Sequence, residues 1–421
     1  MEHRFEAIVI GAGPAGTSAA ILLSCAGRSV AILEARPFPR RKVCGECIAA
    51  SNLPLLDALG LGDSLRERAG PELRRVALWC GEASIIAALP ARAEGDPAWG
   101  RALGREHLDG LLLARARTAG ATVLQPWRAL AIRREPRGGG YQVEARCGEA
   151  ELALQAPVIV RANGSWEVPP SDGTLWSRSH RASDLLGFKA SFRNTRLESG
   201  LLPVLGFGGG YGGMVVGSDG LTTLACCIRR DRLAACRSGA TAGAGAGEAV
   251  EALLLRECRG VREALASASR VGPWLAAGPL RPGMRLEGGI GGAFLIGNAA
   301  GEVHPIIGEG ISMALQSSWL LCEELAGRPD AFRADPWGEI CRREAQQRYA
   351  LRWCAHFSRR MRLAACFAHA AMRPGITAAV LPLLRQAPAL LGFAARVSGK
   401  TRSAAIFPTG LLPGLIQGSS S

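Results

Sequence analysis

The stretch GAGPAG, residues 11–16, decides the fold expected for this chain. It follows the apolar run 7–10 and opens a helix-like stretch, so the order is strand, Gly-rich turn, helix. Gly11 permits the tight turn, Gly13 lets backbone N–H groups approach a pyrophosphate, and Gly16 lets the helix pack against the strand. The N-terminus of this helix offers unpaired N–H groups and the positive end of the helix dipole to a phosphate.

A second apolar run, residues 30–33, ends at Glu34. Glu34 lies 18 residues beyond Gly16, where a carboxylate can hold an adenosine ribose hydroxyl. A Gly-rich turn alone would also suit an unrelated α/β domain. Two strands, a helix and an acid in this order predict a dinucleotide site in a Rossmann-type domain.

Length and charge limit the remaining function classes. A chain of 421 residues is expected to form one large or two coupled domains. The net charge is +14, and nearly all basic residues are arginines, since lysine occurs only at positions 42, 189 and 400. Aromatic and basic residues do not interleave as they do in single-strand binders, so a nucleic-acid partner is not expected. A basic surface suits anionic cofactors or an anionic membrane face.

The cysteines and the N-terminus favour a cytoplasmic location. Thirteen cysteines, an odd number without framework spacing, fit a reducing compartment. The first strand is expected to begin by Phe5, which leaves no room for a signal peptide. Since no apolar stretch of 18 residues is free of charge, we expect no membrane-spanning helix.

Periodicity gives the remaining elements. Helices are expected over 52–70, 105–118, 248–269 and 309–326, and a hairpin over 129–136 and 141–154 with its turn at 138–140. The last 80 residues are expected to be largely helical, with breaks at Pro374, Pro382, Pro388 and Gly392. Residues 73–90 have strand character, and an antiparallel sheet inserted into the first domain is predicted from the pieces 186–193, 202–207, 213–217 and 221–228.

A second Gly-rich block, residues 297–310, indicates which dinucleotide binds. It follows the buried strand expected at 293–296 and opens a helix. A polar residue after the strand can bind the ribityl hydroxyls of FAD. The helix that begins near Gly310 would direct its N-terminus to the pyrimidine end of the flavin, where it stabilises negative charge. We find no second GxGxxG with its strand and acid, so NAD(P)H is expected to bind transiently, or a separate flavin reductase to deliver electrons.

These motifs resemble the FAD-dependent monooxygenase superfamily of the para-hydroxybenzoate hydroxylase fold. Within it, the chain is most similar to the geranylgeranyl reductase, FixC-like and flavin halogenase branch. The resemblance covers about residues 5–330 and rests on GAGPAG at 11–16, KVCGE at 42–46, ANGSW at 162–166 and the block 297–310. Arg105 matches a family helix that contributes an arginine near the flavin, and GGGYGGM at 208–214 resembles the strand that faces the isoalloxazine.

The resemblance implies an α/β fold: a Rossmann-type FAD-binding domain (1–170 and 281–330), an inserted antiparallel-sheet substrate domain (171–280, with part of 73–104) and a helical C-terminal region (331–421). The residues expected to bind FAD are Gly11, Ala12, Gly13, Pro14, Ala15, Gly16, Glu34, Ala35, Lys42, Cys44, Gly45, Arg105, Asn163, Gly297, Asn298, Pro305, Gly308, Gly310 and Ile311. No metal site is expected, because no second Cys/His pair has ligand spacing.

Three departures from the family pattern matter. Asn163 and Asn298 stand where the family usually has aspartate, and an amide can hydrogen-bond a hydroxyl but carries no charge. The tryptophan-halogenase signature GWxWxIP is absent, and no replacement for its catalytic lysine is seen in the sequence. Halogenation is therefore disfavoured.

Cys44 and Cys47 leave two interpretations open. A CxxC after the first βαβ unit could be a redox disulfide beside the flavin. Alternatively, Cys44 belongs to the branch motif that packs along the flavin, and Cys47 is incidental. The missing second nucleotide domain favours the latter.

Three residues are candidates for catalysis: His304, Tyr211 and Glu309. A histidine at this place could act as an acid or base near the flavin, or it could only shape the loop over the ring. The same alternatives apply to Tyr211 and Glu309. The remaining histidines at 107, 180, 356 and 369 have no motif context, and we expect them to be structural or exposed.

The expected activity is that of an FAD-dependent monooxygenase. It would use O₂ to hydroxylate or epoxidise an apolar or aromatic small molecule of secondary metabolism. The alternatives are a geranylgeranyl-reductase-like C=C reductase acting on a prenyl or lipid substrate, a CxxC dithiol oxidase and a non-enzymatic flavin-binding protein. Arg359–Arg362 and the apolar stretches 363–372 and 376–397 suit either helices packed on the substrate domain or peripheral contact with the inner membrane face.

Overall fold

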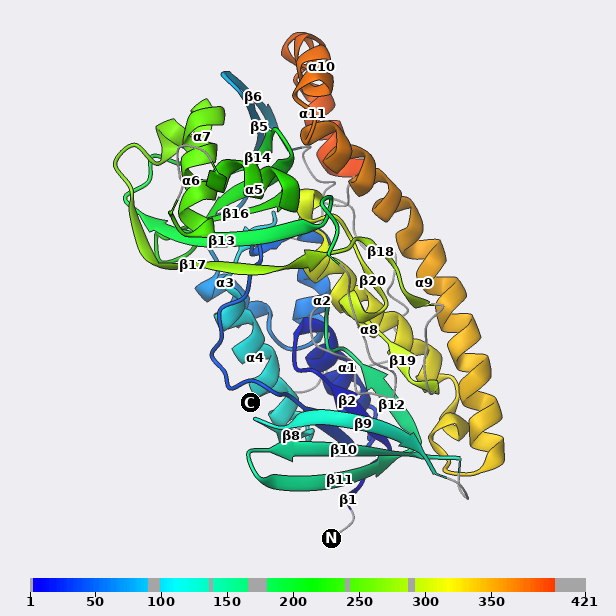
Figure 1. Cartoon of the computed structure of the whole chain (residues 1–421). Helices are drawn as coiled ribbons and strands as arrows, with labels where there is room; N and C mark the ends of the chain where they lie inside the picture. The colour runs from blue at the N-terminus through cyan, green and yellow to red at the C-terminus, as the bar shows by residue number, and fades with distance from the viewer. Residues whose placement is uncertain are drawn as a thin grey trace.

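The computed structural model describes residues 3–89, 99–135, 139–165, 180–238, 243–286 and 292–397. Figure 1 shows two sheet regions, with a long helix, α9 (Pro336–Ala371), running along both. Predicted features at Gly138 and Trp166 lie outside the described residues.

A five-stranded parallel sheet forms the first region. Its strand order is β19 (Phe294–Leu295), β12 (Val158–Arg161), β2 (Ala7–Ile10), β3 (Val30–Leu33) and β8 (Thr122–Leu124). β2, β3 and β12 are buried along their whole length, because helices and a second sheet cover both faces. On the helical side, α1 (Pro14–Cys25) packs against both α4 (Arg105–Thr118) and α8 (Gly310–Ala326).

A four-stranded sheet covers the other face of the parallel sheet. It contains β1 (His3–Arg4), β9 (Arg128–Arg134), β10 (Tyr141–Cys147) and β11 (Ala150–Ala156). The predicted hairpin is therefore a three-stranded meander, since the expected strand 141–154 turns back at Gly148, where φ is +59°. The alternation changes phase at this turn, from odd positions up to Cys147 to even positions from Ala150, a local signal that the prediction of a single strand overlooked. Ile8 and Ile10 of β2 share a buried cluster with Tyr141 and Val143.

A seven-stranded sheet forms the second region. Its order is β17 (Ser269–Leu280), β13 (Leu185–Arg193), β16 (Thr222–Arg229), β15 (Gly210–Val216), β14 (Leu201–Phe207), β5 (Arg75–Cys80) and β6 (Ala83–Ala88). Neighbouring strands are antiparallel except β5 and β14, which pair in parallel. Helices α5 (Arg230–Ser238), α6 (Ala246–Glu257) and α7 (Arg259–Ala264) lie beside the sheet, and α6 and α7 bury apolar residues with it.

Short elements connect the two regions. β4 (Cys47–Ile48) pairs with β7 (Arg101–Ala102), and β18 (Gly283–Met284) pairs with β20 (Gly301–Glu302). The expected helix over 52–70 is split into α2 (Leu53–Ala58) and α3 (Gly62–Arg68) by Gly60, which has a φ of +78°.

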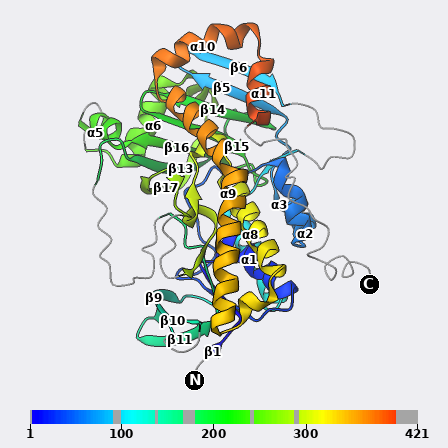
Figure 2. The same ribbon diagram turned by 90° about the vertical axis from the view of Figure 1, so that its right-hand side faces the viewer.

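The C-terminal region is largely helical as far as it is described, up to Val397, as expected. α10 (Pro374–Gln386) and α11 (Ala389–Val397) follow α9, and Figure 2 shows them crossing beside β5 and β6. The breaks predicted at Pro374 and Pro388 are confirmed, but those at Pro382 and Gly392 are wrong because both residues lie inside helices. Pro382 removes one backbone hydrogen bond from a largely exposed helix, which continues past it.

Among the described residues, no single helix is long and apolar enough to span a membrane. α9 and α10 meet the length and composition test only as a pair bent by 102°.

Candidate functional site

A cavity of about 740 Å³ opens at the carboxyl ends of β2, β3 and β12. This edge of an open parallel sheet is where ligands bind in doubly wound folds. The cavity extends from the start of α1 to the start of α8. The predicted residues that line it are Gly11, Gly13, Pro14, Ala15, Glu34, Lys42, Cys44, Gly45, Arg105, Asn163, Gly297, Asn298, Pro305, Gly308, Gly310 and Ile311.

The Gly-rich turn has the geometry that a dinucleotide requires. Gly11 has a φ of +102°, and a Cβ there would lie 2.6 Å from the carbonyl oxygen of Ala162. A Cβ at Gly16 would lie 1.9 Å from the carbonyl oxygen of Gly11, so this glycine sets the packing of α1 on the turn. A Cβ at Gly13 would meet only the Arg105 guanidinium, at 3.9 Å, which leaves the start of α1 open to the cavity. The turn therefore fits the diphosphate of FAD.

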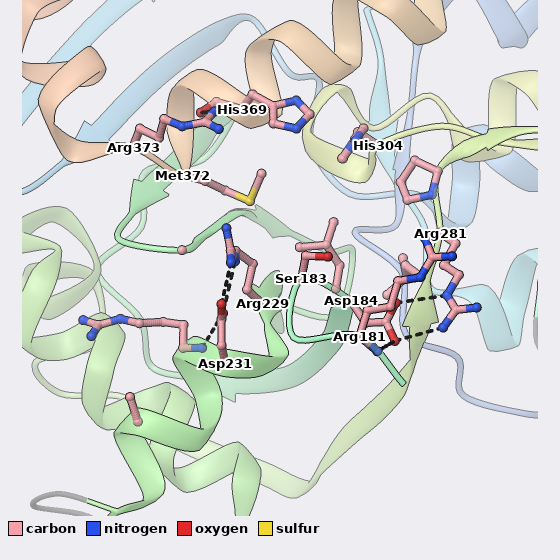
Figure 3. A pocket seen from close by; sticks show the side chains of 16 residues that line it. Arg181, Ser183, Asp184, Arg229, Asp231, Arg281, His304, His369, Met372 and Arg373 are labelled. Carbon is pink, nitrogen blue, oxygen red and sulfur yellow. Dashed lines mark hydrogen bonds and ion pairs between the residues drawn. The ribbon is translucent and has the colours of Figure 1, made fainter. Parts of the chain in front are cut away.

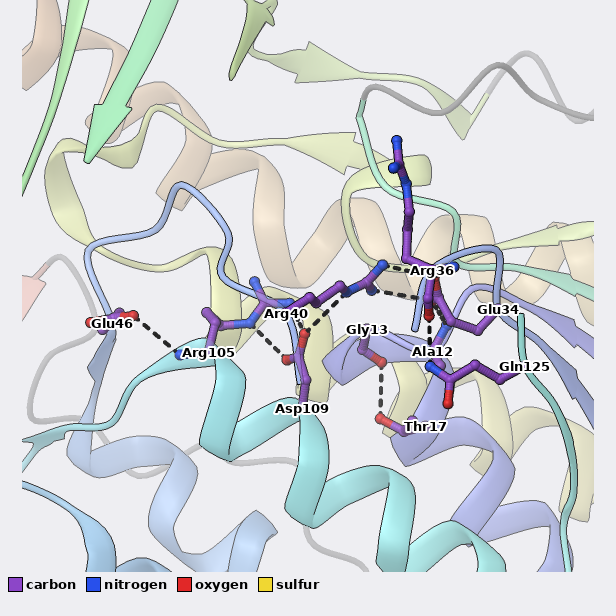
Figure 4. A network of polar contacts seen from close by, with 10 residues as sticks. All are labelled: Ala12, Gly13, Thr17, Glu34, Arg36, Arg40, Glu46, Arg105, Asp109 and Gln125. Atoms are coloured by element: carbon purple, nitrogen blue, oxygen red, sulfur yellow. Dashed lines mark hydrogen bonds and ion pairs between the residues drawn. The ribbon is translucent and has the colours of Figure 1, made fainter. Parts of the chain in front are cut away.

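Glu34 is held at the end of β3 by a dense set of hydrogen bonds (Figure 4). Its side chain is buried, Oε2 accepts from the Ala12 amide at 2.9 Å, and Oε1 accepts from the Arg36 amide at 2.9 Å. Arg40 donates to both oxygens, at 2.7 and 3.1 Å. Predicted residues Ala12, Gly16 and Ala35 do not line the cavity. Ala12 acts instead through its amide, which orients the carboxylate.

Arg105 is fixed by a buried carboxylate one helical turn along α4. Its Nε and Nη2 each donate to Asp109 at 2.7 Å, and the Asp109 side chain is fully buried. Arg40 lies 4.0 Å from the same carboxylate. Figure 4 shows this chain of charges running from Glu34 through Arg40 and Asp109 to Arg105. Both arginines border the cavity, where guanidinium groups suit a diphosphate.

The loop that contains Cys44 ends in a strained residue with a buried side chain. Glu46 has a φ of +58° and is 6% exposed. Its carboxylate accepts hydrogen bonds from Lys189 on β13 and from Thr223 on β16, the latter at 2.7 Å. The loop along the cofactor cavity is thereby attached to the seven-stranded sheet.

Cys44 and Cys47 are both free thiols. Burial raises the pKa of Cys44, although the nearby Arg105 charge opposes this effect. A protonated thiol is a poor attacking group in disulfide exchange. The arrangement favours packing of Cys44 along the cofactor over a dithiol role.

The block 297–310 supplies a carboxylate to the site through Glu302, although Asn298 stands where the family usually has aspartate. Asn298 Nδ2 donates to Ser165 Oγ at 2.9 Å, and Ser165 donates to Glu302 at 2.8 Å. Glu302 is buried and also accepts from Arg285 at 2.7 Å. Asn298, Ser165 and Glu302 all line the cavity, where they fit the ribityl hydroxyls of a flavin.

The start of α8 faces the same cavity. Gly308 has a φ of +62°, and a Cβ added at Gly310 would meet no atom within 4 Å. Gly310 and Ile311 are the first residues of the helix, so the positive end of its dipole points at the site predicted for the pyrimidine ring.

Two of the three catalytic candidates, His304 and Tyr211, lie together, and Glu309 lies elsewhere. Tyr211 Oη lies 3.1 Å from His304 Nδ1, whereas Glu309 is fully buried at the cap of α8, 3.6 Å from Arg360. None of the three lines the cofactor cavity, and His304 lines a second cavity next to it. Burial, with a smaller contribution from His369, lowers the pKa of His304 to about 4. Burial also raises the pKa of Tyr211 well above its usual value, so both groups are neutral at pH 7.

The sequence reasoning missed several residues of the site. Arg40 and Asp109 belong to no motif that we used, and Glu302 lies inside the block 297–310 but was not among the predicted site residues; Asp109 stands four residues after Arg105 on a predicted helix. That spacing alone could have indicated the pair. His369 is exposed, as expected, and its ring also lies edge-on to that of His304, with ring centroids 5.7 Å apart.

Comparison with known proteins agrees with this geometry. The model of the FAD binding domain matches residues 4–170. Over 127 residues the chain is 32% identical to menaquinone reductase of Mycobacterium tuberculosis, and over 186 residues it is 27% identical to aklavinone 12-hydroxylase RdmE of Streptomyces purpurascens. The first match covers 30% of each chain, and the second covers 39% of this chain and 34% of RdmE. The matched segments thus span about a third of these curated relatives.

Solved structures share the fold over most of the chain. The myxobacterial chondrochloren halogenase CndH superposes with a TM-score of 0.70 at 24% identity, covering 85% of this chain and 81% of CndH. A geranylgeranyl bacteriochlorophyll reductase-like protein from Thermoplasma acidophilum superposes with a TM-score of 0.68 at 18% identity, covering 88% of both. The chain therefore contains an FAD binding domain at residues 4–170, and its fold is the one shared by these halogenase and geranylgeranyl reductase-like structures.

Proposed function

We propose that the protein is an FAD-dependent monooxygenase that hydroxylates or epoxidises an apolar or aromatic small molecule. The observation that carries the proposal is the junction of two cavities at Leu280, which lines both the cofactor cavity and the one bordered by His304. A substrate in the second cavity would thus meet the cofactor beside a neutral His304–Tyr211 pair. The similarity to aklavinone 12-hydroxylase supports a hydroxylation.

The residues of the cofactor cavity have separate tasks. When bound, FAD supplies the redox chemistry that activates O₂. The start of α1 at Gly13 binds the diphosphate, Glu34 holds the adenosine ribose, and Asn298 binds the ribityl chain. The start of α8 stabilises negative charge at the pyrimidine end of the flavin.

The His304–Tyr211 pair holds a proton near the junction. The phenol oxygen and Nδ1 lie 3.1 Å apart, so one group can donate while the other accepts. Because the pKa of His304 is about 4, its imidazole is neutral at pH 7 and can accept a hydrogen bond from a substrate hydroxyl. We propose this as its role, with Tyr211 fixing the orientation of the ring.

Electrons must come from outside the described fold. The described residues contain one five-stranded parallel sheet, and its Gly-rich turn serves the FAD site. We therefore propose that NAD(P)H binds transiently or that a separate flavin reductase donates.

A C=C reductase is the second candidate. It is favoured by the buried strand β15, which carries the GGYGG segment, and by the resemblance to menaquinone reductase and to the geranylgeranyl reductase-like fold. In this case the substrate would be a prenyl chain or another lipid.

The C-terminal helices offer a route for an apolar substrate. Val380 and Leu383 on α10 and Leu390 and Phe393 on α11 are exposed, while Leu391 packs against β5 and β6. We propose that this surface rests on an anionic membrane. The test is cosedimentation with phosphatidylglycerol vesicles: L383E/F393E should abolish it, and equal binding by wild type and variant would contradict it.

One experiment separates the two reactions. The FAD-loaded protein is reduced anaerobically with dithionite, then mixed with O₂ or with menaquinone-4 while flavin absorbance is followed. Reoxidation by O₂ within seconds, without any change in the side chain of menaquinone-4, supports the monooxygenase. A prenyl side chain heavier by two hydrogens, measured by mass spectrometry after the quinol is reoxidised in air, supports the reductase. A protein that cannot be loaded with FAD contradicts both.

A further inference from the structure

The second cavity differs in chemistry from the first. It has a volume of about 640 Å³ and lies between the seven-stranded sheet and the end of α9. Figure 3 shows His304 and His369 on one side of it, with Arg229 and Arg281 on other sides. It is the cavity that a substrate would occupy under the proposed function.

Five arginines and only two aspartates line this cavity. The arginines come from separate parts of the fold and converge on one space. They are Arg181 before β13, Arg229 at the end of β16, Arg232 in α5, Arg281 after β17 and Arg373 between α9 and α10. The positive surplus favours an anionic ligand.

Both aspartates are already paired. Asp184 accepts from Arg281 Nε and Nη2, each at 3.0 Å, and Asp231 accepts from Arg229 Nε at 3.0 Å. Arg232 pairs with Glu257 outside the cavity lining. These pairs neutralise three of the five arginines and fix their positions.

Arg181 and Arg373 keep their charge. Within the part of the chain that the structure describes, neither guanidinium forms an ion pair; Arg373 Nη1 donates only to the backbone oxygen of His369, at 3.0 Å. Both residues are exposed at the outer part of the cavity. A guanidinium fork of this kind binds carboxylate or phosphate oxygens.

The rest of the lining is apolar. Leu185, Leu280, Pro282 and Met372 form walls that end at His304. Leu280 also borders the cofactor cavity. The second cavity thus combines a cationic outer part with an apolar path towards the cofactor.

We propose that this cavity binds a ligand with an anionic group, a carboxylate or a phosphate, at its outer part, where Arg181 or Arg373 holds it, and with an apolar body that extends to His304. The proposal rests on the proposed function, because it names the class of substrate for that site. The anionic group belongs either to the substrate or to the reduced nicotinamide dinucleotide that donates electrons, and the test distinguishes these two sources.

The test is isothermal titration calorimetry on the FAD-loaded protein with three probes: octanoate, 1-octanol and NADPH. Octanoate and octanol share a chain length and differ in charge. We expect octanoate to bind at least about tenfold more tightly than octanol. The variant R181Q/R373Q should weaken octanoate about tenfold or more and leave octanol unchanged. Because both arginines are exposed, the variant is expected to fold, and R117Q, an exposed arginine on α4, serves as the control.

The outcomes divide as follows. If R181Q/R373Q weakens the binding of octanoate but not of NADPH, the anionic group belongs to the substrate. If it weakens the binding of NADPH but not of octanoate, the group is a phosphate of the electron donor. If the Kd values of octanoate and of NADPH for R181Q/R373Q equal those for R117Q, the proposal is overturned. Calorimetry requires no turnover. The ligand proposal can therefore fail while the reoxidation experiment supports the monooxygenase, and the ligand proposal can hold while that experiment contradicts the monooxygenase.

Discussion

Lys189 on β13 donates to the Glu46 carboxylate across the boundary between the seven-stranded sheet and the cofactor cavity. Both side chains are buried, at 2% and 8% exposure. Glu46 borders the cavity that fits FAD, and its other oxygen accepts from Thr223. The pair therefore connects the sheet that builds the second cavity with the loop that packs along the cofactor.

Removing the lysine alone should be costly. K189M leaves the Glu46 carboxylate buried without its cation, and we expect a loss of about 3–5 kcal/mol in the free energy of unfolding. Urea denaturation measures this loss, and the affinity for FAD should fall with it, because the loop at Cys44 loses its anchor.

The double variant K189M/E46Q tests the cause. Its neutral amide can still accept from Thr223, so it should recover more than half of the lost stability. R146M breaks the exposed Arg146–Glu151 pair and should cost no more than about 1 kcal/mol. A K189M variant as stable as R146M would show that the buried pair does not hold the loop.

The elements around the cofactor were predictable because their signals are local. GAGPAG and the block 297–310 each combine a preceding strand, a turn and a helix start, Glu34 directly follows a strand, and the structure places all three around one cavity. The extra strand after Gly148 and the continuous helix at Pro382 were missed. At Gly148 a change of phase in the alternating pattern was overlooked, and at Pro382 an exposed helix tolerates the loss of one backbone hydrogen bond.

The contacts that cross between regions were not predictable. Lys189 and Glu46 are 143 positions apart, and nothing in either neighbourhood indicates the partner. The same holds for Arg181 and Arg373, which line one cavity because the end of α9 reaches the seven-stranded sheet. A search restricted to motifs finds the cofactor residues and misses the arginines of the second cavity.

G16A should disrupt the dinucleotide turn. A Cβ at this position would lie 1.9 Å from the Gly11 carbonyl oxygen and 3.1 Å from the Ala162 side chain, so α1 must shift. We expect a loss of about 1–3 kcal/mol in stability and at least about a tenfold weaker affinity for FAD. Thermal unfolding and quenching of flavin fluorescence measure these effects.

G110A is the matched control for G16A. Gly110 lies inside α4, and a Cβ there would meet no atom within 4 Å. The alanine should stabilise the protein by about 0.5–1 kcal/mol and leave FAD binding unchanged. Equal FAD affinity in G16A and G110A would refute the proposed close approach of α1 to the turn.

E34Q should weaken FAD and spare FMN. The Glu34 carboxylate is oriented by the amides of Ala12 and Arg36, and FAD, unlike FMN, carries the adenosine ribose that this residue is proposed to hold. We expect about a tenfold to hundredfold increase in the Kd for FAD, corresponding to the loss of a charged hydrogen bond. E149Q changes an exposed acid and is the control. Equal weakening of FAD and FMN in E34Q would mean that Glu34 acts on the fold and not on the ribose.

His304 should make the protein less stable in acid. Burial is the main cause, and the charge of the nearby His369 a smaller one, of the low pKa of His304, which is about 4. A histidine in the unfolded chain has a pKa of about 6.5. Between these values the unfolded chain binds a proton that the folded protein does not, so the free energy of unfolding falls as the pH drops from 6.5 to 4. Above pH 7 both states are neutral, and the contribution vanishes.

H304N should remove this slope, since asparagine does not titrate. The difference in unfolding free energy between wild type and variant should change by about 2–3 kcal/mol from pH 7 to pH 4, because the carboxylates titrate alike in both proteins and cancel. Urea denaturation at half-unit pH steps measures the difference, with H107N, an exposed histidine on α4, as the control. If the curves of wild type, H304N and H107N run parallel, His304 titrates in the folded protein as it does in the unfolded chain, and burial does not lower its pKa.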